Sequence, residues 1–420
     1  MHKVDILENG LKVVSRPMSH MESVSLGIWI RAGGRYEDKT NSGISHLLEH
    51  LLFKGTKKRD VRKIKEEIEG RGGSFNGFTS EEFTCYLVKL LAKDADLGID
   101  ILSDMVLNPR LDEEEIEKEK NVIIEEINMY KDMPAQHVHE ILAEIMWPGQ
   151  PLGLPLAGTV ESVKSLSRKD IVAYKETFYN TKNMLAIGAG RIDEGRMVDI
   201  CRKYLSSETK KENPGFEKVR REQRSSSLNV NFKETEQTHM ALGFHAMDRF
   251  SPERHALSLV NIILGANMSS RLFHIVRDEM ALCYEISSGV RKYEDTGAFT
   301  IGAGVDNKKL LKATEVILGI LGKMKVESVP EEELGRAKEY YKGQLLFAME
   351  DTMNLMLWLG EKVLSGEKDF STQKIMENID NVKAGDIMRV SQKLFTDENL
   401  SLAVIGPFKE EKALKEVLHI

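Results

Sequence analysis

The stretch Asn41-SGISHLLEHLLFKGT decides how the rest of this chain is interpreted, because its apolar residues recur at helical spacing. The helix that this pattern predicts carries His46, Glu49 and His50. Residues four apart lie on one face of a helix, so the two imidazoles can bind one metal ion and Glu49 can reach a water on it. H-x-x-E-H is the spacing of an inverted zinc-binding motif. A solvated helix face or core histidines would give the same five letters, so the pentapeptide alone leaves these interpretations open.

The composition is that of an ordinary globular chain. With 420 residues, of which 41% are hydrophobic and 30% charged, the chain is too long for one core and predicts two or more domains. Its net charge of -7 argues mildly against a nucleic-acid partner. Three scattered cysteines without a Cys-x-x-Cys pair indicate reduced thiols and a cytoplasmic protein. The sequence shows no signal-peptide core and no apolar run of membrane length, so we expect no membrane partner.

Strand and helix patterns follow one another along the first half of the chain. Apolar residues that alternate predict strands, and apolar residues that recur every three to four positions predict helices. The predicted strands are 11–16, 23–31, 74–86 and the segment after Asn183, and the predicted helices, besides that of His46, are 61–70, 93–107, 111–130 and 167–179.

The second half repeats this order. Three pairs of segments match at offsets of 216 to 218 residues, namely Asn183-MLAIGAG with Asn399-LSLAVIG, Asp170-Ile171 with Asp386-Ile387, and Glu113-EEI with Glu331-EEL. These matches predict a duplicated domain, with copies at 1–210 and 226–420 and a polar linker at 211–225. Nothing in the second copy resembles His-x-x-Glu-His, so only the first copy can carry that site.

A third metal ligand has to come from another element, and the acidic helix 111–130 offers candidates. Glu119 and Glu126 are seven residues apart, two turns along one face, whereas Glu125 points about 100° away. A charged, solvated face is the alternative interpretation of this helix. We expect Val122 and Ile123 to turn the face of Glu126 partly toward the core, and a carboxylate held there favours a cation.

Taken together, these segments resemble the pitrilysin family, whose members include insulin-degrading enzyme and the mitochondrial processing peptidase. His46-LLEH with Glu119 and Glu126 downstream, Leu52-FKGT, Gly73-SFNGFTSEEFT and the duplication all match, so the resemblance covers essentially the whole chain. It implies an α+β fold of two homologous domains, each a mostly antiparallel sheet packed with helices. It also implies that His46, His50 and Glu126 bind one zinc ion per chain.

The resemblance assigns roles to four further residues. Glu49 would be the general base, and Glu119 would support the site from outside the ligand set. In the second copy, Arg277 and Tyr284 would hold the substrate carbonyl and stabilise the oxyanion. Without the family, an ordinary surface arginine and a packing tyrosine would be the favoured interpretation of this pair.

Substrate binding is expected on the predicted strand 74–86, because an extended peptide gains main-chain hydrogen bonds when it joins a sheet edge. By the resemblance, Asn76, Gly77 and Phe78 would lie nearest the scissile bond. Relatives that favour arginine near the cut carry two acidic residues on the next helix. The corresponding positions here are Gln136 and Glu140, and this departure argues against strict arginine selection.

Three classes of function fit these observations. The leading one is a zinc metalloendopeptidase that hydrolyses short or unfolded peptides in a closed chamber. The second is a non-catalytic peptide-binding or assembly subunit of a processing-peptidase-like complex, whose signature would be a broken motif or a glycine-rich loop. The third is a protein with a structural metal, against which the open coordination position argues.

The division of residues between the two copies predicts an assembly. Larger relatives carry four such domains, with the zinc in the first and the Arg/Tyr pair in the last. This chain has His46 in its first copy and Arg277 and Tyr284 in its second. A homodimer whose active sites are completed in trans is therefore expected.

Overall fold

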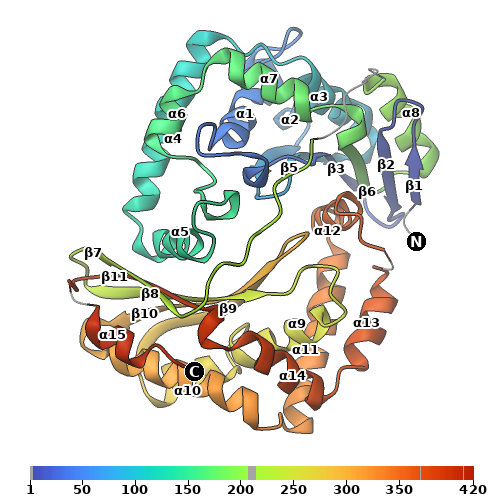
Figure 1. The fold of residues 1–420 in the computed structure, drawn as a ribbon. Helices are drawn as coiled ribbons and strands as arrows, with labels where there is room; N and C mark the ends of the chain where they lie inside the picture. The colour runs from blue at the N-terminus through green and yellow to red at the C-terminus, as the bar shows by residue number, and fades with distance from the viewer. Residues whose placement is uncertain (1–2, 207–213, 369, 410) are drawn as a thin grey trace. The chain divides into compact units, whose positions relative to one another are not determined.

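The computed structural model describes residues 3–206, 214–368, 370–409 and 411–420 (Figure 1). The chain folds into two compact units. Unit 1 comprises residues 1–127, 154–217 and 346–371, and unit 2 comprises 128–153, 218–345 and 372–420. Residues 211–213 of the predicted linker lie outside the described residues.

Unit 1 is built on a six-stranded sheet in the order β1-β2-β6-β3-β5-β4. All neighbouring strands are antiparallel except the parallel pair β2 and β6. The strands are β1 (Lys3–Ile6), β2 (Lys12–Pro17), β3 (Ser23–Ile30), β4 (Ser74–Thr79), β5 (Thr84–Leu91) and β6 (Met184–Gly190). The expected α+β class with mostly antiparallel sheets is confirmed.

Both faces of this sheet are covered. One apolar cluster joins Leu26 and Ile28 to the helices of the first half, and a second joins Trp29 and Ile187 to α12 (Figure 1). Alternation along β3 explains this, because successive side chains of a strand point to opposite faces. The helices of unit 1 are α1 (Ile44–Leu52), α2 (Val61–Glu69), α3 (Ala95–Leu107), α4 (Glu113–Lys131, up to Ile127), α6 (Val160–Ser165), α7 (Arg168–Phe178), α8 (Glu194–Tyr204) and α12 (Thr352–Leu364).

The segment 74–86, predicted as one strand, is instead a hairpin of two strands. β4 pairs antiparallel with β5 and forms the edge of the sheet. The turn between them is closed by Ser80, whose backbone N–H donates to the Phe83 carbonyl at 2.8 Å and whose hydroxyl accepts from the Phe83 N–H at 3.1 Å. The prediction of a single strand was wrong because this turn contains no glycine, proline or asparagine to announce it.

Unit 2 repeats the plan with a five-stranded sheet in the order β7-β11-β8-β10-β9. Here too one pair, β7 and β11, is parallel and the others are antiparallel. The strands are β7 (Ser227–Phe232), β8 (Gln237–Ala246), β9 (Cys283–Lys292), β10 (Gly297–Asp306) and β11 (Leu400–Gly406). The helices are α5 (Pro134–Met146), α9 (Arg254–Leu264), α10 (Leu310–Val326), α11 (Glu331–Glu350, up to Leu345), α13 (Thr372–Asp380), α14 (Ala384–Leu394) and α15 (Lys412–Val417), with a π-helix at Phe273–Glu279.

The units differ from the sequence halves 1–210 and 226–420 because each contains one helix from the other half. α12 packs on β3 and β6 of unit 1, and α5 packs on β8 and β11 of unit 2. Each helix approaches a strand glycine closely. A Cβ at Gly27 would lie 2.7 Å from the Met356 sulfur, and one at Gly243 would lie 2.5 Å from the Met146 sulfur. Each half of the chain therefore contributes one helix that covers the sheet formed by the other half.

None of the helices in the described part of the chain is long and apolar enough to cross a membrane.

Candidate metal centre

Helix α1 is fixed at its start by a buried carboxylate. Glu37 accepts the backbone N–H groups of Gly43 and Ser45, each at 2.8 Å, and so satisfies two donors that a helix N-terminus leaves open. Burial raises the pKa of Glu37, against the lowering effect of its hydrogen bonds with Ser45 and Gly43. The Ser45 hydroxyl also contacts the Tyr174 hydroxyl at 2.7 Å. The helix that carries the motif thus has its first turn held from two other elements.

The structure brings His46, His50 and Glu126 together. The Nε2 atoms of both histidines lie 3.8 Å from the same carboxylate oxygen, Oε2 of Glu126, and the two imidazole rings are 4.7 Å apart. Among the described residues this is the one group of three or more metal-binding side chains whose ligand atoms all lie within 4.8 Å of one another. Two imidazoles and one carboxylate are the donor set of a catalytic zinc site with an open fourth position.

The pKa values of the two histidines are shifted in opposite directions. Burial, and then the neighbouring His50, lower the pKa of His46 to about 4, so this imidazole is neutral at pH 7. Burial also lowers the pKa of His50, but the hydrogen bond with Glu119 and the carboxylates of Glu49 and Glu126 outweigh it and leave that pKa raised. The His46 Nδ1 atom is buried and has no hydrogen-bond partner among the described residues. The two Nε2 atoms face the same Glu126 oxygen, and a neutral His46 fits a metal ligand.

Glu119 supports His50 from behind. Its Oε2 lies 3.2 Å from His50 Nδ1, and its Oε1 lies 2.6 Å from the Lys54 ammonium. Burial acts to raise the pKa of Glu119, but the hydrogen bonds from His50 and Lys54 lower it overall. A carboxylate on the second nitrogen of a ligating histidine fixes its tautomer and ring orientation. Glu119 thus contacts the candidate ligand His50 and is not itself one of the group of three.

The helix face of Glu126 differs from the prediction in one residue. Ile123 is fully buried, as expected, but Val122 is 49% exposed and does not turn this face toward the core. Glu119, at 4% exposure, is the more deeply buried of the two carboxylates.

Glu49 lies near the candidate ligands His50 and Glu126, and one of its carboxylate oxygens accepts a hydrogen bond. The Thr79 hydroxyl donates to Glu49 Oε2 at 2.7 Å. Burial raises the pKa of Glu49, while Thr79 and His50 act in the opposite direction. A raised pKa suits a carboxylate that must both take up and release a proton.

The strand β4 places its predicted substrate residues on two faces. A Cβ at Gly77 would lie 3.2 Å from Glu49 Oε1 and 3.0 Å from the Phe53 ring, so the missing side chain makes room on the side of α1. Phe78 points to the other face, where its ring packs edge-on against Trp29 at 5.5 Å. Asn76 is exposed, and its side-chain oxygen accepts the Gly77 N–H at 2.9 Å.

Arg277 and Tyr284 belong to unit 2, whereas the metal group belongs to unit 1. Arg277 is part of the π-helix, and its guanidinium lies 4.3 Å from the Phe273 ring and 5.7 Å from the Tyr284 ring. Tyr284 is 78% exposed and sits where the register of β9 against β10 shifts. Both π-helical turns and β-bulges occur often at functional sites.

A cavity of about 130 Å³ adjoins Tyr284 within unit 2. Its lining includes His139 of α5, His239 of β8 and Glu285 of β9. Gln136 is exposed on α5, and Glu140 on the same helix is bound by His137 at 2.9 Å. Gln136 and Glu140 belong to unit 2, as Tyr284 does.

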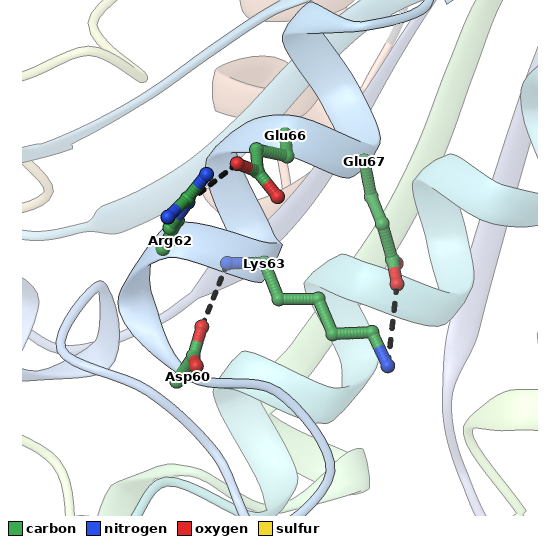
Figure 2. Close-up of a pocket in the computed structure, with 5 residues that line it drawn as sticks. All are labelled: Asp60, Arg62, Lys63, Glu66 and Glu67. Carbon is green, nitrogen blue, oxygen red and sulfur yellow. Dashed lines mark hydrogen bonds and ion pairs between the residues drawn. The ribbon is translucent and has the colours of Figure 1, made fainter.

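A further surface hollow, at the start of α2, has a structural explanation. Figure 2 shows the five charged residues that line it, paired with one another. Asp60 caps the helix by accepting the Lys63 N–H at 2.8 Å, and Arg62 and Lys63 form ion pairs with Glu66 and Glu67. We therefore assign no ligand to it.

Three residues around the candidate metal centre are not among those predicted from the sequence. Glu37, Lys54 and Thr79 act through contacts to residues that lie 6 to 65 positions away, and no local spacing marks them. Thr79 and Lys54 nevertheless lie inside the segments that carried the family resemblance.

Known proteins resemble this chain along its whole length. The family model described as insulinase (peptidase family M16) matches residues 12–160, and that of the peptidase M16 inactive domain matches residues 165–341. The uncharacterized zinc protease YmxG of Bacillus subtilis is 35% identical over 400 residues, which cover 95% of this chain and 97% of that protein.

Solved structures share the fold. A protease from Helicobacter pylori superposes with a TM-score of 0.91 at 22% identity, over 97% of this chain and 99% of that one. A peptidase M16 inactive domain from Pseudomonas fluorescens gives a TM-score of 0.90 at 17% identity, over 97% and 98% of the two chains. The two matched families and the relative that spans nearly the whole length lead to one conclusion: this chain belongs to the insulinase family, peptidase family M16.

Proposed function

We propose that this protein is a zinc-dependent endopeptidase that cleaves short or unfolded peptides. The observation that carries this proposal is the convergence of His46, His50 and Glu126 on one point, with the carboxylate of Glu49 beside them. The relatives named zinc proteases support the same activity.

His46, His50 and Glu126 would hold one zinc ion per chain. When bound, zinc supplies a water that ionises near neutral pH and a Lewis acid for the substrate carbonyl. Glu119 keeps the ring of His50 in place through Nδ1, supported in turn by Lys54. Glu49 takes up the proton of the attacking water and returns it to the leaving amine. Its raised pKa favours the first of these transfers, because it makes the carboxylate a stronger base.

The edge strand β4 is the proposed substrate platform. Its outer side pairs with no other strand of the sheet in the described chain, so an extended peptide can add to it through main-chain hydrogen bonds. Gly77 lies next to Glu49 on this strand. Such binding requires an extended segment, which a tightly packed protein does not offer. A closed chamber formed with a partner chain would add a size limit.

Arg277 and Tyr284 are proposed to complete the site of a second chain. Both are held in one cluster with Phe273, and Tyr284 is largely exposed. Because they belong to a different unit from the metal ligands, a two-fold homodimer with sites completed in trans would supply both groups to each substrate. A cytoplasmic location belongs to the same proposal and is supported by the three free, buried cysteines.

A non-catalytic peptide-binding subunit is the second candidate. One solved structure with this fold is named an M16 inactive domain, and residues 165–341 match the inactive-domain family. The complete ligand set and the nearby Glu49 favour catalysis over this candidate.

Metal analysis combined with cleavage of a quenched peptide tests the activity. We expect about one zinc per chain, cleavage that a chelator abolishes, and recovery when zinc is restored. Denatured or fragmented proteins should be cut while their folded forms survive. Zinc binding without any cleavage of a peptide library would favour the non-catalytic subunit.

Subunit mixing tests the assembly. His50→Ala and Arg277→Ala chains should each be nearly inactive, and mixed dimers should contain one site with both sets of residues intact. An equal mixture should recover about a quarter of wild-type activity, because half the dimers are mixed and each has one whole site. No recovery after demonstrated subunit exchange would show that Arg277 does not act in trans.

A further inference from the structure

Glu49 has two carboxylate oxygens, and the structure gives them different surroundings. Oε2 accepts a hydrogen bond of 2.7 Å from the Thr79 hydroxyl. Oε1 faces Gly77, whose absent Cβ would lie 3.2 Å away. One oxygen is therefore occupied by a donor, and the other borders a position without a side chain.

Thr79 reaches Glu49 because of the pleat of β4. Thr79 is paired with Thr84 of β5, and alternation puts Phe75, Gly77 and Thr79 on the face of the sheet that meets α1. The partner strand is anchored in turn, since the buried Thr84 hydroxyl donates to the Ala32 carbonyl at 3.0 Å. The hydroxyl of Thr79 is thus carried by a hydrogen-bonded hairpin and not by a loop.

A buried carboxylate needs such a contact for geometric reasons. Glu49 is 8% exposed and has three rotatable side-chain bonds, so its carboxylate plane is not fixed by its place on α1. A general base has to lie within hydrogen-bond reach of the proton that it abstracts, and a misplacement of about 1 Å can cost about 10²-fold in rate. A single short hydrogen bond to Oε2 fixes which oxygen remains available.

We propose that Thr79 is a positioning residue that holds Glu49 Oε2 and so presents Oε1 as the atom that accepts the proton. This inference rests on the proposed peptidase function, in which β4 also binds the substrate. The strand β4 would then both bind the peptide and orient the carboxylate of Glu49. The alternative is that Thr79 is simply a β-branched residue that suits a half-buried strand.

The variant Thr79→Val separates these two roles, because valine keeps the shape and β-branching but removes the hydroxyl. We expect kcat for a quenched peptide to fall about 10- to 10²-fold, with KM within about twofold of wild type and zinc content unchanged. Thr79→Ser keeps the hydroxyl and should stay within about threefold of wild-type kcat. Thr84→Val is the matched control on the paired strand, and it should lower Tm without this loss of kcat.

A double variant tests whether the effect of Thr79 on kcat depends on Glu49. If Thr79 acts through Glu49, then Thr79→Val should change kcat little when Glu49→Gln is already present. A full, multiplicative loss in that background would overturn the proposal. So would wild-type kcat in Thr79→Val, or a loss in Thr79→Ser as large as in Thr79→Val.

A structural measurement, which does not depend on peptide cleavage, tests this inference separately from the proposed function. Crystal structures of the metal-free wild type and of Thr79→Ser should show Glu49 in one conformation, and Thr79→Val should show it displaced or in several. An ordered, unmoved Glu49 in Thr79→Val would overturn the positioning role. Absence of zinc-dependent cleavage by the wild type would instead refute the peptidase, while these structures still test the hydrogen bond.

Discussion

Helices α4 and α11 occupy equivalent places in the two repeats, yet only α4 carries carboxylates at its seventh and fourteenth positions, Glu119 and Glu126. Both helices start with three glutamates. Counted from the first residue of each helix, Glu119 and Glu126 of α4 correspond to Ala337 and Gln344 of α11. The five-stranded sheet β7-β11-β8-β10-β9 of unit 2 repeats the order β2-β6-β3-β5-β4 of unit 1, which has β1 as an additional edge strand. A scaffold of this kind keeps its fold while a few side chains decide whether it holds a metal.

The helices that follow β3 and β8 differ in the same way. α1 leaves His46 and His50 half-buried on one face, with its leucines against the core. In α9, eight of eleven residues are buried, and its one histidine, His255, is among them. α9 is therefore a core helix, whereas α1 combines a core face with a face that carries two candidate metal ligands.

The largest expected effect comes from removing a ligand. His50→Ala should abolish zinc binding and lower peptide cleavage to the background, because two remaining ligands cannot hold the ion at neutral pH. Elemental analysis of the purified chain checks the first result and a quenched peptide the second. His255→Ala, in the helix that holds no metal, is the matched control and should retain both. Full zinc occupancy in His50→Ala would contradict the assigned site.

Glu49→Gln is expected to have the next largest effect. Glutamine keeps the size of the side chain but cannot take up the proton, so turnover should fall about 10²- to 10⁴-fold while zinc remains bound. Parallel measurements of zinc content and kcat separate this outcome from loss of the metal. Near-normal turnover would remove Glu49 from the mechanism.

Glu119→Gln should have an intermediate effect that appears first in affinity. The variant loses the charge that faces both His50 and Lys54, and loss of such a supporting carboxylate typically weakens metal binding about 10- to 100-fold. Competition with a chelator of known strength measures the change. Gln344→Ala, at the corresponding face of α11, should leave zinc affinity unaltered, and an equal loss there would show that the effect is not local.

The smallest expected effect is a change in stability, which should differ between a substitution at the start of α1 and one at the start of α9. The two oxygens of Glu37 each accept one buried backbone N–H, and Glu37→Gln replaces one of these oxygens by an NH₂ group. One N–H then loses its acceptor, which should lower the free energy of unfolding by about 1–3 kcal/mol. Glu253, at the start of α9, makes no cap and pairs with the exposed Arg389 and Lys393, so Glu253→Gln should cost less than about 1 kcal/mol. Urea unfolding compares the two, and equal losses would contradict the special role of Glu37.

The sequence was sufficient for features encoded by local spacing. His46 and His50 were found because helical periodicity is a property of adjacent residues, and the duplication because matching segments kept their order. The proposed role of Glu126 rests on the family resemblance, since Val122, which was expected to mark a core face, is exposed. The hairpin was missed because Ser80 closes its turn with side-chain hydrogen bonds that composition does not reveal.

The features that the sequence did not predict depend on tertiary contacts. Thr79 and Glu49 meet only when β4 packs beside α1, and Lys54 meets Glu119 only when α1 and α4 approach. The placement of α5 and α12 is likewise not written in their own periodicity, because an amphipathic helix shows which side it buries but not against which sheet.

The exchange of α5 and α12 has a consequence for any fragment that contains only one of the two repeats. A chain that ended between the two repeats would retain α5 but lack α12, and the face of its sheet around Val14, Trp29 and Ile187 would be bare. The other fragment would keep α12 and expose Ala241, Ala403 and Ile405. Exposed apolar faces of this kind promote aggregation. Because each sheet takes one covering helix from the other repeat, neither repeat alone would bury both faces of its sheet.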